Sequence, residues 1–229
     1  MIKVVQCWDD GVEDDIRLIA LLRRHGAKAS FNLNPGLHDA QRGHTWRYKD
    51  AKDVRRLAKG ELVGVYEGFT IANHTVTHPW PLKISPDEWR REVVDARKML
   101  QDIFAQPVDG FVYPYGQRSD ETDRVVVEAG HTYARGTGPV CAAEPRGYPP
   151  ANPFRFVPDG HFKDADLLEK FASAKASGAP VFYFWGHSYE MIADDEWARM
   201  DGILQTFAAD AEAEWADLPD LFRPSHGKK

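Results

Sequence analysis

The sequence has few cysteines, no long apolar run and no cluster of basic residues. Cys7 and Cys141 are the only cysteines among 229 residues, too few for a disulfide framework. No apolar stretch approaches the ~20 residues that a membrane-spanning helix requires, so no membrane is expected as a partner. The net charge is −6, which argues against nucleic acid as a partner. A strand pattern begins directly after Met1 without a signal peptide, and together these features predict a cytoplasmic protein.

The composition is that of an ordinary globular protein, with 43% hydrophobic and 28% charged residues. A chain of 229 residues is long enough to bury a substantial core. It contains no internal repeat, low-complexity segment or convincing interdomain linker. We therefore predict a single domain over residues 1–229.

Strand and helix patterns alternate along the chain. The predicted strands are residues 2–8, 27–33, 62–66, 69–72, 109–115, 131–135, 154–157 and 180–185. The predicted helices are residues 13–25, 50–59, 85–104, 120–129, 164–177, 194–209 and 211–217, with loops at 37–49 and 136–153. This alternation predicts an α/β fold with a parallel sheet. About seven such units favour a (β/α) barrel, and an open doubly wound sheet is the alternative.

Polar side chains follow several of the predicted strands. Active sites in parallel α/β folds gather at the carboxyl ends of the strands, so we expect these side chains to lie close together. They are Asp9, Asp10, His74, His78, Tyr115, Arg135 and His187.

Asp10, His74 and His78 have the chemistry of a metal site. Two imidazoles and one carboxylate make a three-ligand site with open positions, suited to zinc or another divalent transition metal. With Asp10 as the third ligand, Asp9 is left free to handle protons. The alternatives remain open: a solvated turn for the two aspartates, and a pair of surface histidines in a polar loop.

Four segments lie at the ends of predicted strands: Cys7-Trp8-Asp9-Asp10-Gly11, His74-Thr75-Val76-Thr77-His78, residues 111–116 and residues 184–187. Together they resemble the polysaccharide deacetylase family, carbohydrate esterase family 4, also called the NodB-homology domain. The family's Thr-Phe-Asp-Asp-Gly is matched by residues 7–11, and its His-(Ser/Thr)-x-x-His by residues 74–78. The third motif is seen in residues 111–116, and the last, a strand-end histidine, in residues 184–187. Each motif alone is weak, whereas four in order over residues 1–190 are specific.

The resemblance implies a distorted barrel of seven or eight βα units that removes an N-acetyl or O-acetyl group from a sugar or glycan. By this resemblance Asp10, His74 and His78 bind a divalent metal, with zinc favoured and cobalt, nickel or manganese as alternatives. Asp9 is similar to the family's catalytic base, and His187 to its catalytic acid. The resemblance further implies that the metal would polarise the acetyl carbonyl and activate a water, and that the backbone N–H of Tyr115 would help to bind the oxyanion.

The chain departs from the family pattern at two positions. The arginine that pairs with the catalytic aspartate is replaced by Val112, and Arg135 is our candidate for the missing cation. The aspartate that tunes the acid histidine has no clear match, and Asp159 or His161 is the candidate replacement. A surface salt bridge and a loop histidine are the alternatives for Arg135 and His161. Glu190 either supports the site or begins the next helix.

Aromatic residues are frequent around the predicted site, and Trp80 and Tyr115 are the candidates for contact with a sugar ring. Two other functions remain open. One is hydrolysis of another C–N bond, such as a cyclic amide, on the same scaffold. The other is a non-catalytic carbohydrate-binding protein. The loss of the arginine at Val112 favours this function. The retention of all the proposed metal-binding and catalytic residues argues against it, and these are Asp9, Asp10, His74, His78 and His187.

Overall fold

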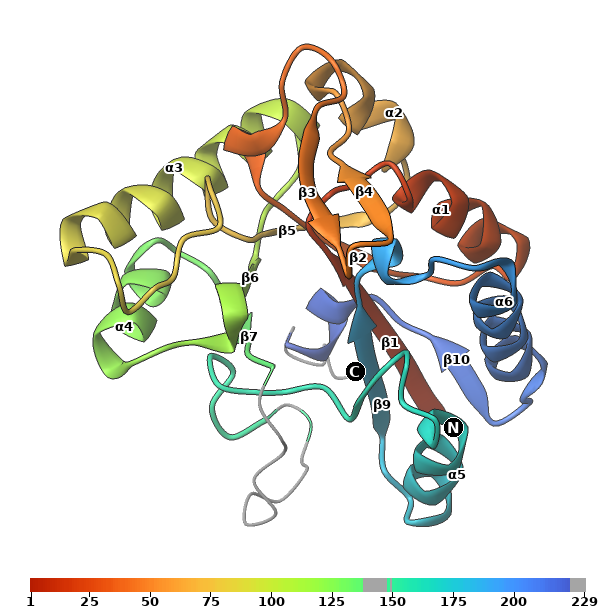
Figure 1. Cartoon of the computed structure of the whole chain (residues 1–229). Coiled ribbons are helices and arrows are strands. Elements are labelled where there is room, and N and C mark those ends of the chain that lie inside the picture. Colours follow the sequence, from red (N-terminus) through yellow and green to blue (C-terminus); the bar gives the residue numbers. More distant parts are fainter. Residues whose placement is uncertain (138–147, 149, 223–229) are drawn as a thin grey trace.

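The structure, a computed structural model, describes residues 1–137, 148 and 150–222 (Figure 1). Cys141 and most of the loop predicted at 136–153 lie outside these residues. The strands are β1 (Ile2–Asp9), β2 (Ser30–Leu33), β3 (His44–Tyr48), β4 (Lys52–Arg55), β5 (Thr70–Asn73), β6 (Gly110–Val112), β7 (Tyr133–Arg135), β8 (Gly160–His161), β9 (Val181–Gly186) and β10 (Ala213–Trp215). The α-helices are α1 (Asp15–Arg24), α2 (Leu62–Val65), α3 (Pro86–Phe104), α4 (Asp120–Glu128), α5 (Leu167–Ala176) and α6 (Asp194–Ala209).

The described strands other than β3 and β4 form one curled parallel sheet. Their order is β7-β6-β5-β2-β1-β9-β8, and β10 pairs with the first residues of β1. Beyond β7 the chain continues the curl, because Arg135 forms a parallel bridge with Phe156, and Asp159 N–H donates to Tyr183 of β9. The predicted α/β class, a distorted barrel with about seven parallel strands, is therefore confirmed as a curled half-barrel.

The central strand β1 is buried on both faces, which is typical of a parallel sheet covered by helices. Side chains alternate between the two faces of a strand. Val4 and Trp8 pack in the large cluster that includes residues of α1, α5 and α6, whereas Val5 and Cys7 pack with Tyr183 in a second cluster. By the same alternation Asp9 lies on the face of Cys7.

The remaining helices cover the other end of the sheet. In Figure 1, α3 and α4 lie side by side beyond β5 and β6, while α1 and α6 lie next to each other on one side of β1. The start of α3 is as the sequence predicts, because Ser85 accepts from Glu88 N at 3.3 Å and Glu88 accepts from Ser85 N at 2.9 Å. Within the described residues, no helix combines the length and apolar character needed to cross a membrane.

Several predicted elements are wrong. The predicted helix 50–59 contains β4, and the predicted loop 37–49 contains β3. These two strands pair in an antiparallel hairpin. The predicted strand 62–66 is the single-turn helix α2, and the predicted helix 211–217 contains β10. The predicted strand 154–157 is reduced to one bridge at Phe156. For β4 and β10, pairing with another strand outweighs the local pattern.

We expect Gly110→Ala to destabilise the fold. A Cβ atom at Gly110 would overlap the ring and hydroxyl of Tyr133, whose side chain is fully buried. Overpacking of this kind costs about 1–3 kcal/mol. The matched control is Gly202→Ala in α6, where an added Cβ meets nothing within 4 Å and should stabilise the helix by up to about 1 kcal/mol. Urea midpoints measure both changes, and equal midpoints for Gly110→Ala and the wild type would contradict the packing.

Candidate active site

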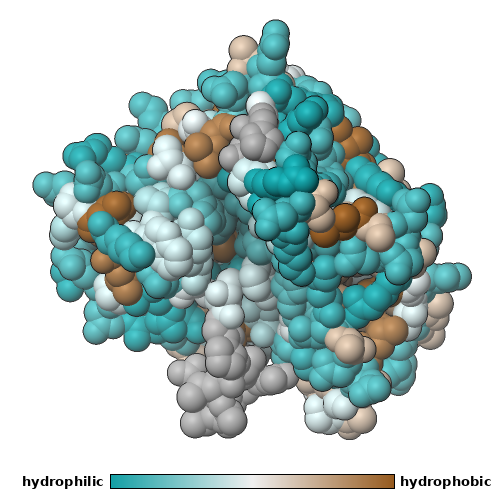
Figure 2. All heavy atoms as spheres, in the orientation of Figure 1, coloured by the Kyte–Doolittle hydropathy of each residue, from teal (hydrophilic) through white to brown (hydrophobic). Residues whose placement is uncertain are grey.

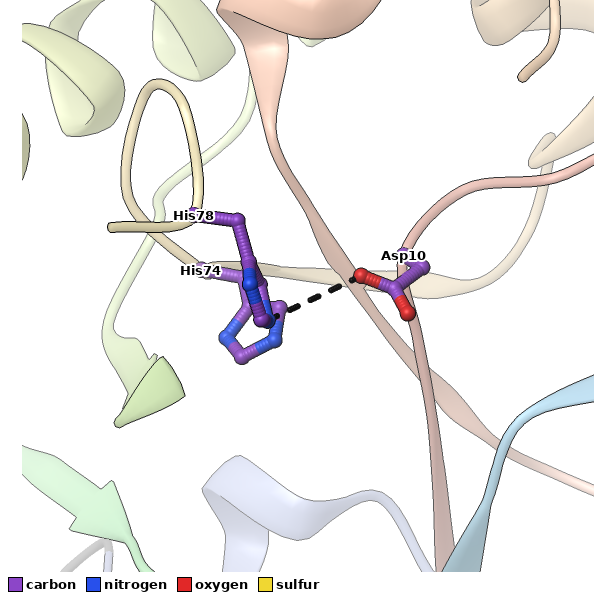
Figure 3. A group of neighbouring side chains, drawn as sticks. All are labelled: Asp10, His74 and His78. Carbon is purple, nitrogen blue, oxygen red and sulfur yellow. Dashed lines mark ion pairs between the residues drawn. The ribbon is translucent and has the colours of Figure 1, made fainter. Parts of the chain in front are cut away.

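Asp10, His74 and His78 meet at the carboxyl ends of β1 and β5 (Figure 3). Each offers one ligand atom, and these atoms all lie within 4.8 Å of one another. The Oδ1 atom of Asp10 is 3.9 Å from Nε2 of His78. One carboxylate oxygen and two imidazole nitrogens at this spacing fit a divalent transition metal with open coordination positions.

The two histidines have the protonation that a metal ligand needs. Nδ1 of His74 lies 2.8 Å from the carbonyl oxygen of Val112. A carbonyl only accepts, so Nδ1 carries the proton and Nε2 keeps its lone pair. Burial, helped by the neighbouring His78, lowers the pKa of His74 to about 4, and burial also lowers the pKa of His78. Both imidazoles are therefore neutral near pH 7.

The backbone around these residues is held in the left-handed region, with φ of 87° at Asp10, 70° at Thr75 and 57° at His78. Such conformations are unfavourable for residues other than glycine and persist only where neighbouring contacts fix them. Thr75 N donates to Oδ1 of Asn73 at 2.8 Å, and His78 N donates to Oγ1 of Thr75 at 3.0 Å. Residues 74–78 thus form a loop held by hydrogen bonds between polar groups and not a helix.

Asp9 lies beside this cluster and is paired with Arg135. Nη2 of Arg135 is 2.6 Å from Oδ1 and 2.7 Å from Oδ2 of Asp9, and Asn32 donates to Oδ1 at 2.6 Å. All three side chains are buried. Burial opposes ionisation of Asp9, but Arg135, with smaller contributions from His74 and His187, outweighs it and holds the pKa of Asp9 below its usual range.

Arg135 is the register partner of Val112 across β6 and β7. Partners in a parallel pair present their side chains to the same face of the sheet. The arginine that the family resemblance leads us to expect at position 112 is thus supplied from the adjacent strand.

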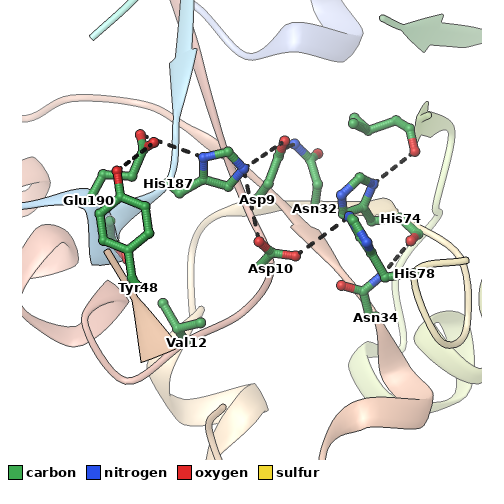
Figure 4. A network of polar contacts seen from close by, with 12 residues as sticks. Asp9, Asp10, Val12, Asn32, Asn34, Tyr48, His74, His78, His187 and Glu190 are labelled. Carbon is green, nitrogen blue, oxygen red and sulfur yellow. Dashed lines mark hydrogen bonds and ion pairs between the residues drawn. The ribbon is translucent and has the colours of Figure 1, made fainter. Parts of the chain in front are cut away.

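His187 lies on the other side of Asp9 and Asp10 (Figure 4). Its Nε2 atom is 4.0 Å from Asp9 Oδ2 and 3.9 Å from Asp10 Oδ2. Its Nδ1 atom is 3.5 Å from Oε2 of Glu190, and the same oxygen is 2.9 Å from Nε2 of His161. Burial lowers the pKa of His187, but Glu190, Asp10 and Asp9 together outweigh burial and raise this pKa above its usual value.

Of the two candidates named for tuning His187, only His161 lies in this cluster. Asp159 instead accepts from the backbone N–H of Tyr183 at 2.8 Å. The sequence leaves two roles open for Glu190, support of the site or the start of the next helix. In the structure its carboxylate lies between His161 and His187.

Trp80 and Tyr115 stack on each other at the edge of the site, with ring centroids 3.7 Å apart and planes 4° from parallel. The Nζ atom of Lys83 lies 4.5 Å from the centroid of Trp80. Trp80 and Tyr115 line a cavity of about 440 Å³ together with Asp9, Asp10 and His187. Figure 2 shows this mostly hydrophilic face hollowed near its centre. The stack makes one wall of the cavity, and contact of these rings with a sugar stays a prediction.

Sequence reasoning missed several residues of this site. Asn32 bonds to Asp9, Tyr189 lines the cavity, and Arg56 contacts Asp10. Asn32 lies within β2 and inside the predicted strand 27–33, so the strand-end rule that selected the other residues does not find it. Arg56 follows β4, a strand that the sequence does not predict, and has no such signal either.

The comparisons with known proteins agree with this arrangement. A family model described as polysaccharide deacetylase matches residues 2–134. The chain belongs to the polysaccharide deacetylase family.

Two curated members of this family are similar in sequence. YxkH of Bacillus subtilis, which its name places among polysaccharide deacetylases, is 23% identical over 146 residues, covering 63% of this chain and 48% of that protein. A peptidoglycan-N-acetylglucosamine deacetylase of Bacillus cereus is 27% identical over 117 residues, covering 50% and 37%. The chain thus spans about half or less of these relatives.

Solved structures of the polysaccharide deacetylase family share the fold. A family 4 carbohydrate esterase from Bacillus anthracis superposes with a TM-score of 0.62 at 16% identity, covering 96% of this chain and 81% of that chain. BA3943 of Bacillus anthracis, a family 4 pseudoenzyme, gives 0.59 at 14% identity, covering 96% and 65%. The fold is therefore common to enzymes and to a pseudoenzyme, and the fold alone does not establish activity.

Asp15, the first residue of α1, ties together the loops that follow β1 and β9. It is fully buried and accepts hydrogen bonds from Val12 N at 3.2 Å, Tyr66 Oη at 2.6 Å and Ser188 Oγ at 2.5 Å. Burial outweighs these bonds and raises the pKa of Asp15 to about 7. Ser188 directly follows His187, so Asp15 helps to fix the position of that histidine.

We expect Asp15 to make the protein less stable as the pH rises towards 7. The folded-state pKa of about 7 lies above the ordinary aspartate pKa of 3.8. The folded state therefore holds a proton that the unfolded state has released, and the stability from this group, complete below about pH 4, is lost as the pH rises through 7. Urea unfolding at pH 5, 6 and 7 should show Asp15→Asn gaining on the wild type by about 1.4 kcal/mol per pH unit. Parallel pH profiles for the two proteins would rule this out.

Proposed function

We propose that this chain is a metal-dependent hydrolase that removes acetyl groups, most readily N-acetyl, from a sugar or glycan. The observation that supports the proposal is the convergence of Asp10, His74 and His78 beside a second carboxylate, Asp9, that has its own buried guanidinium. Membership of the family and the cavity next to these groups agree with an acetylated carbohydrate as the substrate.

The donor set of Asp10, His74 and His78 fits zinc best, with cobalt, nickel or manganese as alternatives. When bound, such a cation polarises an acyl carbonyl and makes a water molecule more acidic. The protein contributes one anionic oxygen and two neutral imidazoles, and the Val112 carbonyl fixes the tautomer of His74.

Asp9 is the proposed general base. Arg135 keeps this buried carboxylate ionised, because burial alone would favour the protonated form. Arg135 and Asn32 also fix its orientation from two sides, so that it is pre-positioned to accept a proton from the attacking water.

His187 is the proposed general acid. Glu190 beside Nδ1 stabilises the doubly protonated imidazole, and Nε2 faces the two aspartates. In this form His187 donates a proton to the departing amine or alkoxide, which is otherwise a poor leaving group. The backbone N–H of Tyr115 is the proposed additional donor to the oxyanion.

Cytoplasmic location, predicted from the sequence, stays a prediction.

Removal of the metal should abolish activity reversibly. We expect chelator-treated protein to release no acetate from N-acetylglucosamine oligomers, and zinc or cobalt to restore release in proportion to the metal bound. Acetate is measured enzymatically and metal content by mass spectrometry. Full turnover by metal-free protein would contradict the proposal.

Asp9→Asn should lower kcat by about 10²–10⁴-fold, the range typical for loss of a general base, without lowering metal content. The matched control is Asp194→Asn, which changes a carboxylate that is 92% exposed and should leave kcat unchanged. Undiminished turnover by Asp9→Asn would remove Asp9 from the mechanism. A metal-loaded wild type that binds acetylated sugars but hydrolyses none of a broad panel would instead indicate a non-catalytic carbohydrate-binding protein.

A further inference from the structure

Arg56 is a buried arginine that contacts the main chain and the side chain of Asp10. Its side chain is only 5% exposed. Nη1 donates to the carbonyl oxygen of Asp10 and, at 3.0 Å, to Oδ1 of Asn34, while Nη2 lies 3.4 Å from Oδ1 of Asp10. One planar guanidinium thus holds the left-handed backbone of Asp10 and touches its carboxylate.

The main chain around Arg56 is fixed against the Asp10 loop. Arg56 forms an antiparallel bridge with Val12, and Leu57 N donates to the carbonyl of Gly11 at 3.2 Å. The ring of Trp46 lies 5.2 Å from the Arg56 guanidinium carbon. The β3–β4 hairpin therefore delivers this arginine to the site in a defined orientation.

Asn34 extends the contact to the histidine loop. Its Nδ2 atom donates to the carbonyl oxygens of His74 and, at 3.2 Å, of Thr75. Asn34 is fully buried, as is Thr75, and Thr75 has a left-handed backbone. Figure 4 shows Asn34 beside His74, directed towards the main chain of the loop.

We propose that Arg56 and Asn34 are a pair of positioning residues that hold the ligands Asp10 and His74 in the geometry a metal requires. The chain of contacts runs from the Asp10 carbonyl through Arg56 and Asn34 to the His74 and Thr75 carbonyls. It joins two loops that are separate in sequence and supplies donors to carbonyls in strained backbone. The proposal rests on the proposed function, because it takes these residues as metal ligands.

If charge alone mattered, Arg56 would weaken metal binding and would not support it. Arg56 is a cation next to the proposed cation site, so its charge weakens metal binding by repulsion. Added negative charge at position 34 would likewise strengthen binding. A variant that keeps the positive charge at position 56, or adds a negative charge at position 34, should therefore not lose metal affinity through charge. A loss of affinity in such a variant would show that the positions of the ligands have changed.

The test uses Arg56→Lys and Asn34→Asp in the full chain. Lysine keeps the charge but cannot make the planar contacts to Asp10 and Asn34. Aspartate has the shape of asparagine but no donor for the His74 and Thr75 carbonyls. We expect each variant to bind Zn²⁺ about 10–100-fold more weakly by chelator competition, and the visible absorption bands of the Co²⁺-loaded protein to shift.

Arg97→Lys is the matched control. Arg97 also binds main-chain carbonyls, those of Val108 at 2.9 Å and Ala129 at 3.1 Å, but away from the site. It should lose stability without losing Zn²⁺ affinity. Thermal melts establish that each protein is folded at the temperature of measurement, and if one site variant does not fold, the other decides.

Unchanged or tighter Zn²⁺ binding by the folded site variants would overturn the positioning role while leaving the proposed function intact. A wild type that binds none of Zn²⁺, Co²⁺, Ni²⁺ and Mn²⁺ would instead overturn the proposed function itself. A loss of affinity in Arg97→Lys equal to that in the site variants would show a general effect of stability and would also overturn the positioning role.

Discussion

Two ionised carboxylates, Asp9 and Asp10, are buried side by side where β1 ends, and the structure around them is built to keep both charged. Burial of an unpaired ion costs several kcal/mol even after relaxation, so each carboxylate needs a nearby cation. Arg135 contacts both oxygens of Asp9 at 2.6 and 2.7 Å, whereas the nearest approach of Arg56 to the Asp10 carboxylate is 3.4 Å. The tight pair commits Asp9 to one partner. The looser pair leaves Asp10 able to bind a metal beside His74 and His78.

Parallel strands make this concentration of charge attainable. Asp9 and Arg135 are 126 residues apart in sequence and both lie on strands of the parallel sheet, whereas Arg56, 46 residues from Asp10, comes from the β3–β4 hairpin. Because every pair within the curled sheet is parallel, the loops after β1, β5 and β9 open at the same end. Buried apolar side chains of β1 pack into the core on both faces of the sheet and so fix the strand that carries Asp9 and leads to Asp10. The strained backbone at Asp10 and Thr75 is thus held by a rigid sheet on one side and by buried hydrogen bonds on the other.

The sequence predicts the sheet class and most elements that carry the site, because buried parallel strands read as short apolar runs ending in polar residues. It does not predict the elements whose conformation depends on distant contacts. Lys52–Arg55 has one buried side chain, Val54, and becomes a strand through pairing with β3. Ala213–Trp215 becomes a strand by pairing with the start of β1. Arg56 carries no local signal either. Asn34 directly follows the predicted strand 27–33, but the sequence does not show which carbonyls its side chain reaches after folding.

The replacement of the expected arginine by Val112 shows why charge position is a better guide to this site than motif identity. Val112 and Arg135 are register partners on neighbouring strands. An arginine at either position would therefore project its side chain from the same face of the sheet and from adjacent positions. The long side chain covers the remaining distance, and the Arg135–Asp9 contacts are as short as a charged pair allows. Glu190 makes the same point at His187, where a glutamate three residues along the chain stands beside Nδ1. In this chain the cation beside Asp9 is therefore found from the strand register and not from the motif alone.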